Sequence, residues 1–304
     1  MSAKKGKLPK SFRVSKLERK NYKWIYAFLL PSLAVFLLFY LVPIVTIFAT
    51  SFTSWDGFHA PVFIGIRNYV QMFKDSSFRI ALKNLLIWSL IAGTLHVFFG
   101  VLIAFLLYQK PKGWKFVRAV YMIPNVISMA AWALIYKFIF NNDIGLLNGL
   151  IRKVVPNFEV QWFFSSPYAF WAVTFTWLFY AVIVTLIVLN DLMSIPGEVL
   201  EAARIDGASG WNLTRNIMLP LCRNSIGTGV ILSITARVAM FESIALTTSG
   251  GPGDDTMNIP LILVNAISDM RYGYANTAGV VMFLVGIITL LIVNKAFRMN
   301  DPVY

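Results

Sequence analysis

Long runs of apolar residues, separated by short polar connections, dominate the chain from residue 24 onward. A helix needs about 20 apolar residues to cross a bilayer, because each residue adds about 1.5 Å. Six runs approach or exceed that length, and they cover residues 24–48, 84–108, 119–140, 168–189, 226–248 and 276–294. The third run is interrupted by Pro124 and Asn125. The pattern predicts an all-α, polytopic membrane protein with six transmembrane helices.

The first run has a second interpretation, a cleaved signal peptide. Such a signal has an apolar core of only about 7 to 15 residues before a cleavage site of small residues. Residues 24–48 form a much longer run, so we interpret them as a retained span. A transmembrane β-barrel is excluded, because its strands alternate in short segments whereas these runs are continuous.

The composition agrees with a membrane protein that has little mass in water. Hydrophobic residues make up 58% of the chain and charged residues 13%, with a mean hydropathy of +0.67. A soluble domain carries about 25% charged residues. The single cysteine, Cys222, allows no internal disulfide, and with only His59 and His96 beside it a Cys- or His-based metal site is not expected.

The basic residues lie on one set of connections. Eighteen of the 27 Lys and Arg residues lie before the first run or in the segments that follow the second, fourth and sixth runs. These basic segments alternate along the chain with segments that are less basic. Cytoplasmic segments carry this excess of Lys and Arg, so both termini are expected in the cytoplasm. The net charge of +13 is therefore an orientation signal, and without any nucleic-acid motif we expect no nucleic-acid partner.

The longest cytoplasmic connection, residues 190–223, is expected to form two short helices. Pro196 suits the first turn of a helix, Ser194 could cap it, and Gly207 could end it. A second helix is expected over residues 211–218. Two short helices joined through a glycine would protrude into the cytoplasm as a docking device for a partner protein.

The same connection resembles a known motif. Glu201-Ala202-Ala203, Gly207 and Ile217-Met218-Leu219-Pro220 have the spacing of the EAA motif of membrane subunits in binding-protein-dependent ABC importers. Further segments resemble the carbohydrate-uptake branch, of the maltose or glycerol-phosphate permease type; they are residues 51–56, 65–69, 121–124, 249–252 and 273–275. The resemblance covers nearly all of the chain from about residue 25. It departs from the pattern at Leu213 and Asn224, where relatives often carry Phe and Pro.

The resemblance implies the type I permease fold of ABC importers, in a bacterial cytoplasmic (inner) membrane. A basic cytoplasmic tail, residues 1–23, would precede a six-helix transmembrane domain, residues 24–298, with the coupling loop at about 194–223 and a short cytoplasmic tail at 299–304. The implied partners are a second, usually non-identical permease subunit, two ATPase subunits and an extracytoplasmic solute-binding protein. The chain has no G-x-x-x-x-G-K-[ST] sequence. It is therefore not expected to be an enzyme or to hold a cofactor, and ATP and Mg²⁺ would bind to the ATPase subunits.

The resemblance also implies which residues couple the chain to an ATPase; they are Glu201, Ala202, Ala203, Asp206, Gly207, Leu219 and Pro220. Glu201 would be a charged anchor, the two alanines would allow close backbone approach, and Gly207 would set the turn. The alternative for Glu201 and Asp206 is a solvated helix face or a local pair with Arg204.

Candidate path residues for the solute lie in the fourth and fifth runs. Ionisable groups inside a membrane usually face a cavity or a partner, and Arg237 sits inside the fifth run. Sugar rings rest their apolar faces on aromatic rings, while their hydroxyl groups need donors and acceptors. Trp177 and Tyr180 are three residues apart, so they share one face of a helix. Ser233 and Met240 share a face with Arg237 for the same reason. The candidates for the path are Trp177, Tyr180, Ser233, Arg237, Met240 and Glu242.

Other interpretations of these residues stay open. The aromatic pair could pack against lipid or other helices, and His96 is expected to be a packing residue. Arg237 could pair with Glu242 or with the second permease, or it could meet an acidic solute such as a uronate or a phosphate ester. The predicted function is the permease subunit of an ATP-driven sugar importer; the alternative is an ion-coupled secondary transporter of a polar solute.

Overall fold

The computed structural model of the chain describes residues 16–299, with side chains from Tyr22 onward. The predicted tails, residues 1–23 and 299–304, therefore lie mostly outside the described residues. The chain divides into two compact units, residues 1–49 and 50–304. The described part of both units is mainly helical, which confirms the predicted structural class.

The first unit is one long apolar helix. A stretch of 29 residues, Tyr22–Thr50, is long and apolar enough to cross a membrane, and it contains the predicted first run. Its large apolar side chains are exposed on every face. A helix that is hydrophobic all round belongs in lipid or inside a protein assembly. Its elements are α1 (Lys16–Phe36), the π-helical turn η2 (Leu37–Leu41) and α2 (Val42–Thr50), whose last residue begins the second unit.

The second unit opens with a short antiparallel hairpin in which Thr53 pairs with Phe63, and it is helical from there on. The strands are β1 (Thr53–Ser54) and β2 (Val62–Phe63). The first half contains α3 (Arg67–Lys74), α4 (Ser76–Ile91), η3 (Ala92–His96), α5 (Val97–Tyr108), α6 (Trp114–Met122), η4 (Ile123–Val126), α7 (Met129–Ile139) and α8 (Leu146–Arg152). The second half contains α9 (Tyr168–Leu178), α10 (Val182–Ser194), α11 (Gly197–Ile205), α12 (Gly210–Leu213), η5 (Thr214–Met218), α13 (Leu219–Leu221), α14 (Arg223–Val238), α15 (Glu242–Ala245), α16 (Ile259–Ser268) and α17 (Tyr272–Ala296).

Four described helices have the length and apolarity of a membrane span, or up to six if each of two bent pairs is one span. The four are Tyr22–Thr50, Ser76–Tyr108, Tyr168–Ser194 and Tyr272–Ala296. The bent pairs are Trp114–Val126 with Met129–Ile139, at 107°, and Gly210–Leu221 with Arg223–Val238, at 68°. The interruption predicted at Pro124 and Asn125 is confirmed, because a 3₁₀ turn over Ile123–Val126 ends the first helix of the first pair.

The helix predicted over residues 226–248 is shorter than expected. Helix α14 ends at Val238, and a separate short helix, α15, begins at Glu242. The carbonyl oxygen of Met240 accepts a hydrogen bond from the amide of Asn258, which lies far along the chain. A tertiary hydrogen bond thus replaces the helical ladder at this point, and the apolar pattern alone cannot reveal it.

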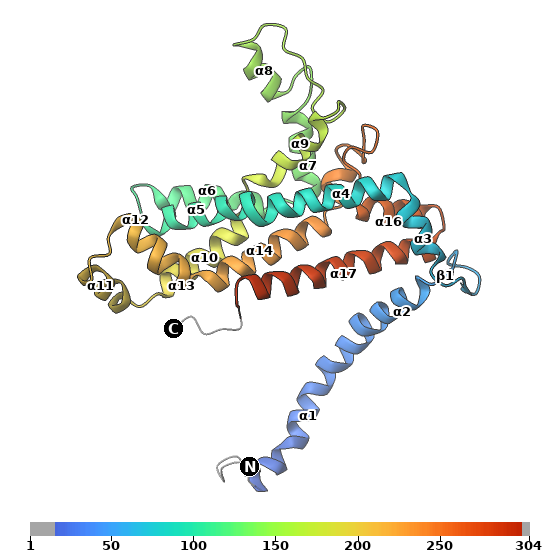
Figure 1. The fold of residues 1–304 in the computed structure, drawn as a ribbon, viewed down its shortest axis with the longest axis horizontal. Coiled ribbons are helices and arrows are strands. Elements are labelled where there is room, and N and C mark those ends of the chain that lie inside the picture. The colour runs from blue at the N-terminus through green and yellow to red at the C-terminus, as the bar shows by residue number, and fades with distance from the viewer. Residues whose placement is uncertain (1–15, 300–304) are drawn as a thin grey trace, which may run out of the picture. The chain divides into compact units, whose positions relative to one another are not determined.

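The centre of the second unit is formed by α5, α10, α14 and α17, which run side by side in Figure 1. Helix α10 packs between α5 and α14 through Val184. A Cβ atom added to Gly100 of α5 would lie 2.7 Å from the Cβ of Val184, and one added to Gly229 of α14 would lie 3.1 Å from its Cγ1. Small residues allow membrane helices to approach closely, which is the device that closes this three-helix contact.

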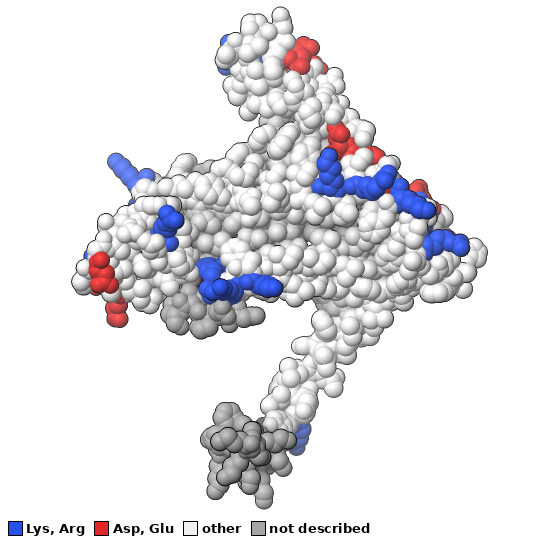
Figure 2. All heavy atoms as spheres, in the orientation of Figure 1, with Lys and Arg blue, Asp and Glu red and all other residues white. Residues whose placement is uncertain are grey.

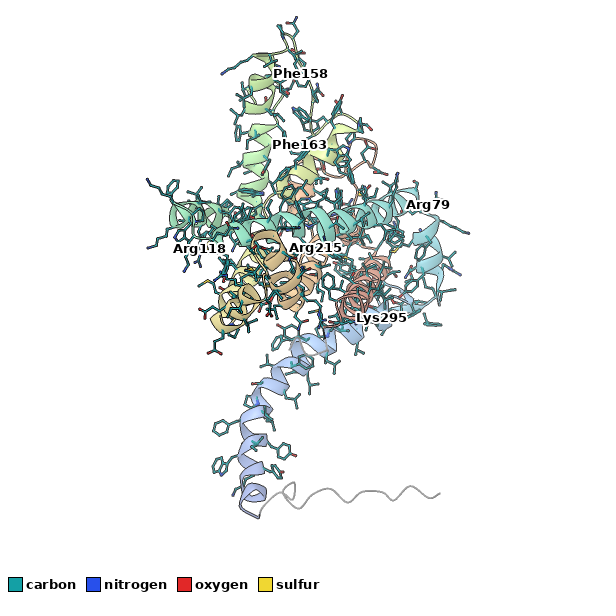
Figure 3. The ribbon with its side chains drawn as sticks, turned by 60° about the vertical axis from the view of Figure 1, so that its left-hand side comes forward. Arg79, Arg118, Phe158, Phe163, Arg215 and Lys295 are labelled. Atoms are coloured by element: carbon teal, nitrogen blue, oxygen red, sulfur yellow. The ribbon has the colours of Figure 1, made fainter. Side chains whose placement is uncertain are left out.

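Charged side chains on the face shown in Figure 2 gather near the two ends of the second unit and leave a wide uncharged band between them. In Figure 3, Arg118 and Arg79 lie at opposite ends of this band, while Phe158 and Phe163 lie on the extension that follows α7. An uncharged band between charged ends suits a bilayer, because hydrocarbon excludes charge.

Candidate functional site

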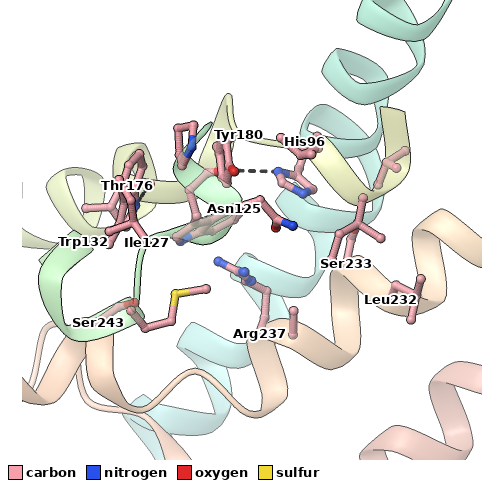
Figure 4. Close-up of a pocket in the computed structure, with 18 residues that line it drawn as sticks. His96, Asn125, Ile127, Trp132, Thr176, Tyr180, Leu232, Ser233, Arg237 and Ser243 are labelled. Atoms are coloured by element: carbon pink, nitrogen blue, oxygen red, sulfur yellow. Dashed lines mark hydrogen bonds between the residues drawn. The ribbon is translucent and has the colours of Figure 1, made fainter. Parts of the chain in front are cut away.

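A cavity of about 160 Å³ lies where η3, the bend before α7, the α9–α10 junction and α14 meet. Four of the six predicted path residues line it: Trp177, Tyr180, Ser233 and Arg237. Figure 4 shows Arg237 and Ser233 on α14 facing Trp132, Asn125 and Tyr180 across this space.

The other two predicted residues lie outside the cavity lining. Met240 is buried behind it, with its Sδ 3.6 Å from the Nη1 of Arg237. Glu242 is exposed at the start of α15 and forms no ion pair with Arg237. Both were placed on the assumption of a continuous fifth helix, which the break at residues 239–241 removes.

Helices change course all around this cavity. The α9–α10 junction unwinds at residues 179–181, α14 stops at Val238, and a 3₁₀ turn precedes α7. Between α4 and α5, the π-helical turn η3 contributes His96 to the lining of the same space. Irregular backbone at membrane depth is tolerated only inside protein or along a water-filled cavity, and π-bulges often mark functional sites. The clustering of four irregularities therefore makes this cavity the candidate functional site of the second unit.

Side chains satisfy the backbone groups that these breaks release. The Nδ1 of His96 donates to the carbonyl oxygens of Trp177 and Leu178, at 3.1 and 3.0 Å. The indole of Trp132 donates to the carbonyl of Thr176 at 2.9 Å, and the amide of Ala181 donates to the hydroxyl of Tyr121 at 3.0 Å. A buried unpaired backbone group costs about as much as a lost hydrogen bond, so these contacts hold the unwound segment in place.

Sequence reasoning placed Trp177 and Tyr180 on one helical face, but a different geometry brings them together. Helix α9 ends at Leu178, so Tyr180 lies in the unwound turn. His96 was expected only to pack; it is buried and hydrogen-bonded as expected, and it also forms part of the cavity wall. Trp132 was missed, because a tryptophan in an apolar run carries no signal of its own.

Four polar atoms of the residues that line the cavity lack partners within the described part of the chain. The Nε1 of Trp177, the Oη of Tyr180, the Oγ of Ser233 and the Nε of Arg237 are buried without a hydrogen-bond partner in the described residues. The guanidinium carbon of Arg237 lies 4.2 Å from the centre of the Trp177 ring. Buried polar groups are normally paired, so four unpaired atoms around one space indicate a site for a polar ligand.

The connection between α10 and α14 has the expected two-helix form. Helix α11 runs from Gly197 to Ile205 and ends in a left-handed turn at Gly207, with a φ of +88°. A second helical stretch follows over Gly210–Leu221, which includes Leu219 and Pro220. Ser194 does not cap α11, since its hydroxyl donates to the carbonyl of Asp191.

The EAA residues divide between the two sides of α11. Glu201, Ala202 and Asp206 are exposed, and neither acid forms an ion pair with Arg204 in the described residues. Ala203 faces inward and belongs to an apolar cluster. The exposed side of α11 is therefore free to contact a partner, while the other side anchors the helix.

Comparisons with known proteins agree on one kind of protein. A family model described as "Binding-protein-dependent transport system inner membrane component" matches residues 96–300, which is more than half of the chain. The chain is 31% identical over 279 residues to the probable ABC transporter permease protein YurN of Bacillus subtilis, with 90% of this chain and 95% of that protein covered.

A second relative is the multiple sugar-binding transport system permease protein MsmF of Streptococcus mutans, which is 31% identical over 275 residues and covers 89% of this chain and 94% of its own length. The fold is similar to that of a chain in the crystal structure of a bacterial alginate ABC transporter in complex with an alginate pentasaccharide-bound periplasmic protein. That match has a TM-score of 0.77 at 22% identity and covers 94% and 97% of the two chains.

Proposed function

Because the chain belongs to the family of inner membrane components of binding-protein-dependent transport systems, we propose that it forms half of the translocation path of an ATP-driven importer for a sugar or sugar-like solute. The family and the apolar helices make it a multi-pass inner membrane protein. Relatives named for sugar transport, such as MsmF, support carbohydrate as the class of solute.

The cavity is the observation that carries this proposal. It offers unpaired donors from Trp177, Ser233 and Arg237 beside the aromatic rings of Trp132 and Tyr180. Sugars match this combination, because their ring faces are apolar and their hydroxyl groups are polar. The surrounding helix breaks supply segments that can move when the path opens.

The proposed topology has six spans with both termini in the cytoplasm. Each bent pair contributes one span; in the second pair the span is Arg223–Val238, because Gly210–Leu221 belongs to the cytoplasmic loop. Lys and Arg then concentrate on cytoplasmic segments, including the loop that contains α11. A second permease subunit would complete the path, and an extracytoplasmic binding protein would deliver the solute.

The exposed side of α11 is proposed to dock on an ATPase subunit. Glu201, Ala202 and Asp206 would contact the ATPase, while Gly207 would set the direction of the following segment. Leu219 and Pro220 would fix the second helix of the loop. ATP and Mg²⁺ would bind to the two ATPase subunits, and closure of those subunits and docking of the loaded binding protein would favour the same outward-open state.

Reconstitution tests the proposal. The permease pair, the ATPases and the cognate binding protein are placed in proteoliposomes, and uptake of radiolabelled saccharides is followed with and without ATP. Uptake should require ATP, the ATPases and the binding protein together. Uptake by this chain with an ion gradient and no ATPase would contradict the proposal and support the secondary transporter.

A pair of variants tests the cavity within the same assay. Ser233→Leu fills part of the cavity and should reduce uptake strongly, while the assembled complex keeps its ATPase subunits. Ser268→Leu is the matched control, because Ser268 is exposed on α16 and donates only to a carbonyl of its own helix. Equal uptake by both variants would show that the solute does not pass through this cavity.

A further inference from the structure

We propose that the solute of this path is an acidic saccharide, whose anionic group is held by Arg237. The inference rests on the proposed function and narrows its class of solute. It starts from the surroundings of the Arg237 guanidinium. Its described contacts are the ring of Trp177, at 4.2 Å from the guanidinium carbon, and the Sδ of Met240, at 3.6 Å from Nη1.

The charge of Arg237 has no counter-ion in the described residues. Their ion pairs are Asp56 with His59 and Arg152 with Glu159, and none of these four residues lines the cavity. The cavity lining contains no Asp or Glu. Glu242, the nearest acid along the chain, is exposed at the start of α15.

The contacts that exist do not offset the partial burial of this cation, whose Nε is fully buried. Arginine stays protonated in proteins, so its charge cannot be removed by loss of a proton. A cation over an aromatic ring gains about 0.5 to 2 kcal/mol, and a cation at a helix C-terminus gains about 0.3 to 1 kcal/mol. Removing an ion from water costs several kcal/mol even after relaxation. An anionic group of the ligand would offset this remaining cost and accept a hydrogen bond from the free Nε.

The remaining groups of the cavity fit the same class of ligand. Trp177 and Arg237 can only donate hydrogen bonds, and both have a buried nitrogen without a partner. The unpaired hydroxyl groups of Tyr180 and Ser233 both donate and accept, so they can serve the hydroxyl groups of any sugar, whereas the lining contains no carboxylate to pair with Arg237. Carboxylate, sulfonate and phosphate oxygens are acceptors only, so an acidic saccharide matches this donor-rich wall.

The test compares matched saccharides in proteoliposomes that contain the full importer and its cognate binding protein. The pairs are digalacturonate with galactobiose, 6-deoxy-6-sulfoglucose with glucose, and glucose 6-phosphate with glucose. ATP-dependent uptake should be confined to acidic members, and the member that is transported identifies the anionic group. ATP-dependent uptake of a neutral member, unchanged in Arg237→Gln, would overturn the inference and leave the proposed function standing. No ATP-dependent uptake of any saccharide would count against the proposed function itself.

Variants of Arg237 locate the recognition. Arg237→Gln should lower kcat/KM for the acidic saccharide about tenfold or more, since a hydrogen bond to a charged group is lost. Arg237→Lys should retain part of the activity because it keeps the charge. Lys137→Gln is the matched control, because Lys137 is an exposed cation of the adjacent helix α7 that donates to the carbonyl of Leu246 and lies outside the cavity lining. Assembly of each complex is checked by gel filtration, and equal kcat/KM in Arg237→Gln and wild type would refute the assignment.

Discussion

Gly207 offers the sharpest test of the loop that follows α11. Its φ is +88°, and a Cβ atom at this position would meet nothing within 4 Å. A substitution therefore costs only backbone strain, because there is space for the side chain. For an L-residue the left-handed region costs about 1 to 2 kcal/mol, which changes a conformational equilibrium roughly 5- to 30-fold.

Gly207→Ala should shift the loop away from its native turn by that factor and lower uptake several-fold. Gly207→Asn should restore most of the uptake, because asparagine tolerates the left-handed region better than alanine. The measurements are uptake in proteoliposomes and the ATP hydrolysis stimulated by the loaded binding protein. The ratio of uptake to ATP hydrolysis should fall in Gly207→Ala, because the loop would transmit closure of the ATPase less faithfully.

Two glycines serve as matched controls. Gly197, in the same loop, has open space and no positive φ, so Gly197→Ala should leave uptake unchanged. Gly113 has open space and a φ of +87° but lies at the start of α6, outside the EAA segment. Gly113→Ala should therefore cost similar stability without affecting coupling. If Gly113→Ala and Gly207→Ala reduce coupling equally, the loss comes from general strain, and the docking role assigned to Gly207 is wrong.

Two further results follow from packing and charge. Gly100→Ala should lower the melting temperature of the purified complex by overpacking worth about 1 to 3 kcal/mol, because its Cβ would lie 2.7 Å from that of Val184. Gly286→Ala, with open space, is the control and should leave the melting temperature unchanged. The exposed His59 has a pKa raised by the carboxylate of Asp56, so their contact stabilises the loop at low pH and is lost as pH rises through that raised pKa. NMR titration should show the pKa of His59 falling toward its ordinary value in Asp56→Asn, and an unchanged titration would contradict the pairing.

The spans could be predicted from the sequence because apolar length is a local property. The described helices Ser76–Tyr108 and Tyr272–Ala296 contain the predicted runs 84–108 and 276–294. The turn at Gly207 was also predictable, since glycine is the residue that most readily adopts a positive φ. The family resemblance carried by the EAA segment is confirmed by the family match.

The breaks in the fourth and fifth runs could not be predicted in this way. They are stabilised by His96 and Asn258, which come from segments distant in sequence and replace the helical ladder with tertiary hydrogen bonds. Only the break beside Pro124 carries a local signal, because proline lacks the amide donor. Arg237 and Ser233 could be selected because polar residues are rare in an apolar run, whereas Met240 and Glu242 depended on helical spacing that stops at Val238.

One apolar cluster links the loop of α11 to the cavity. Leu200 and Ala203 of α11 belong to the same cluster of buried residues as Ala181, Val184 and their neighbours in α10 and α5. Ala181 and Val184 also line the cavity, so a close-packed path of side chains joins the two places. Packed cores have low compressibility and transmit displacement, whereas the unwound turn at residues 179–181 can change its backbone angles. A displacement of α11 would therefore move α10 as a rigid element, and the turn at residues 179–181 would change its backbone angles in response. This turn lies at the cavity wall, where an alternating-access importer needs the movement.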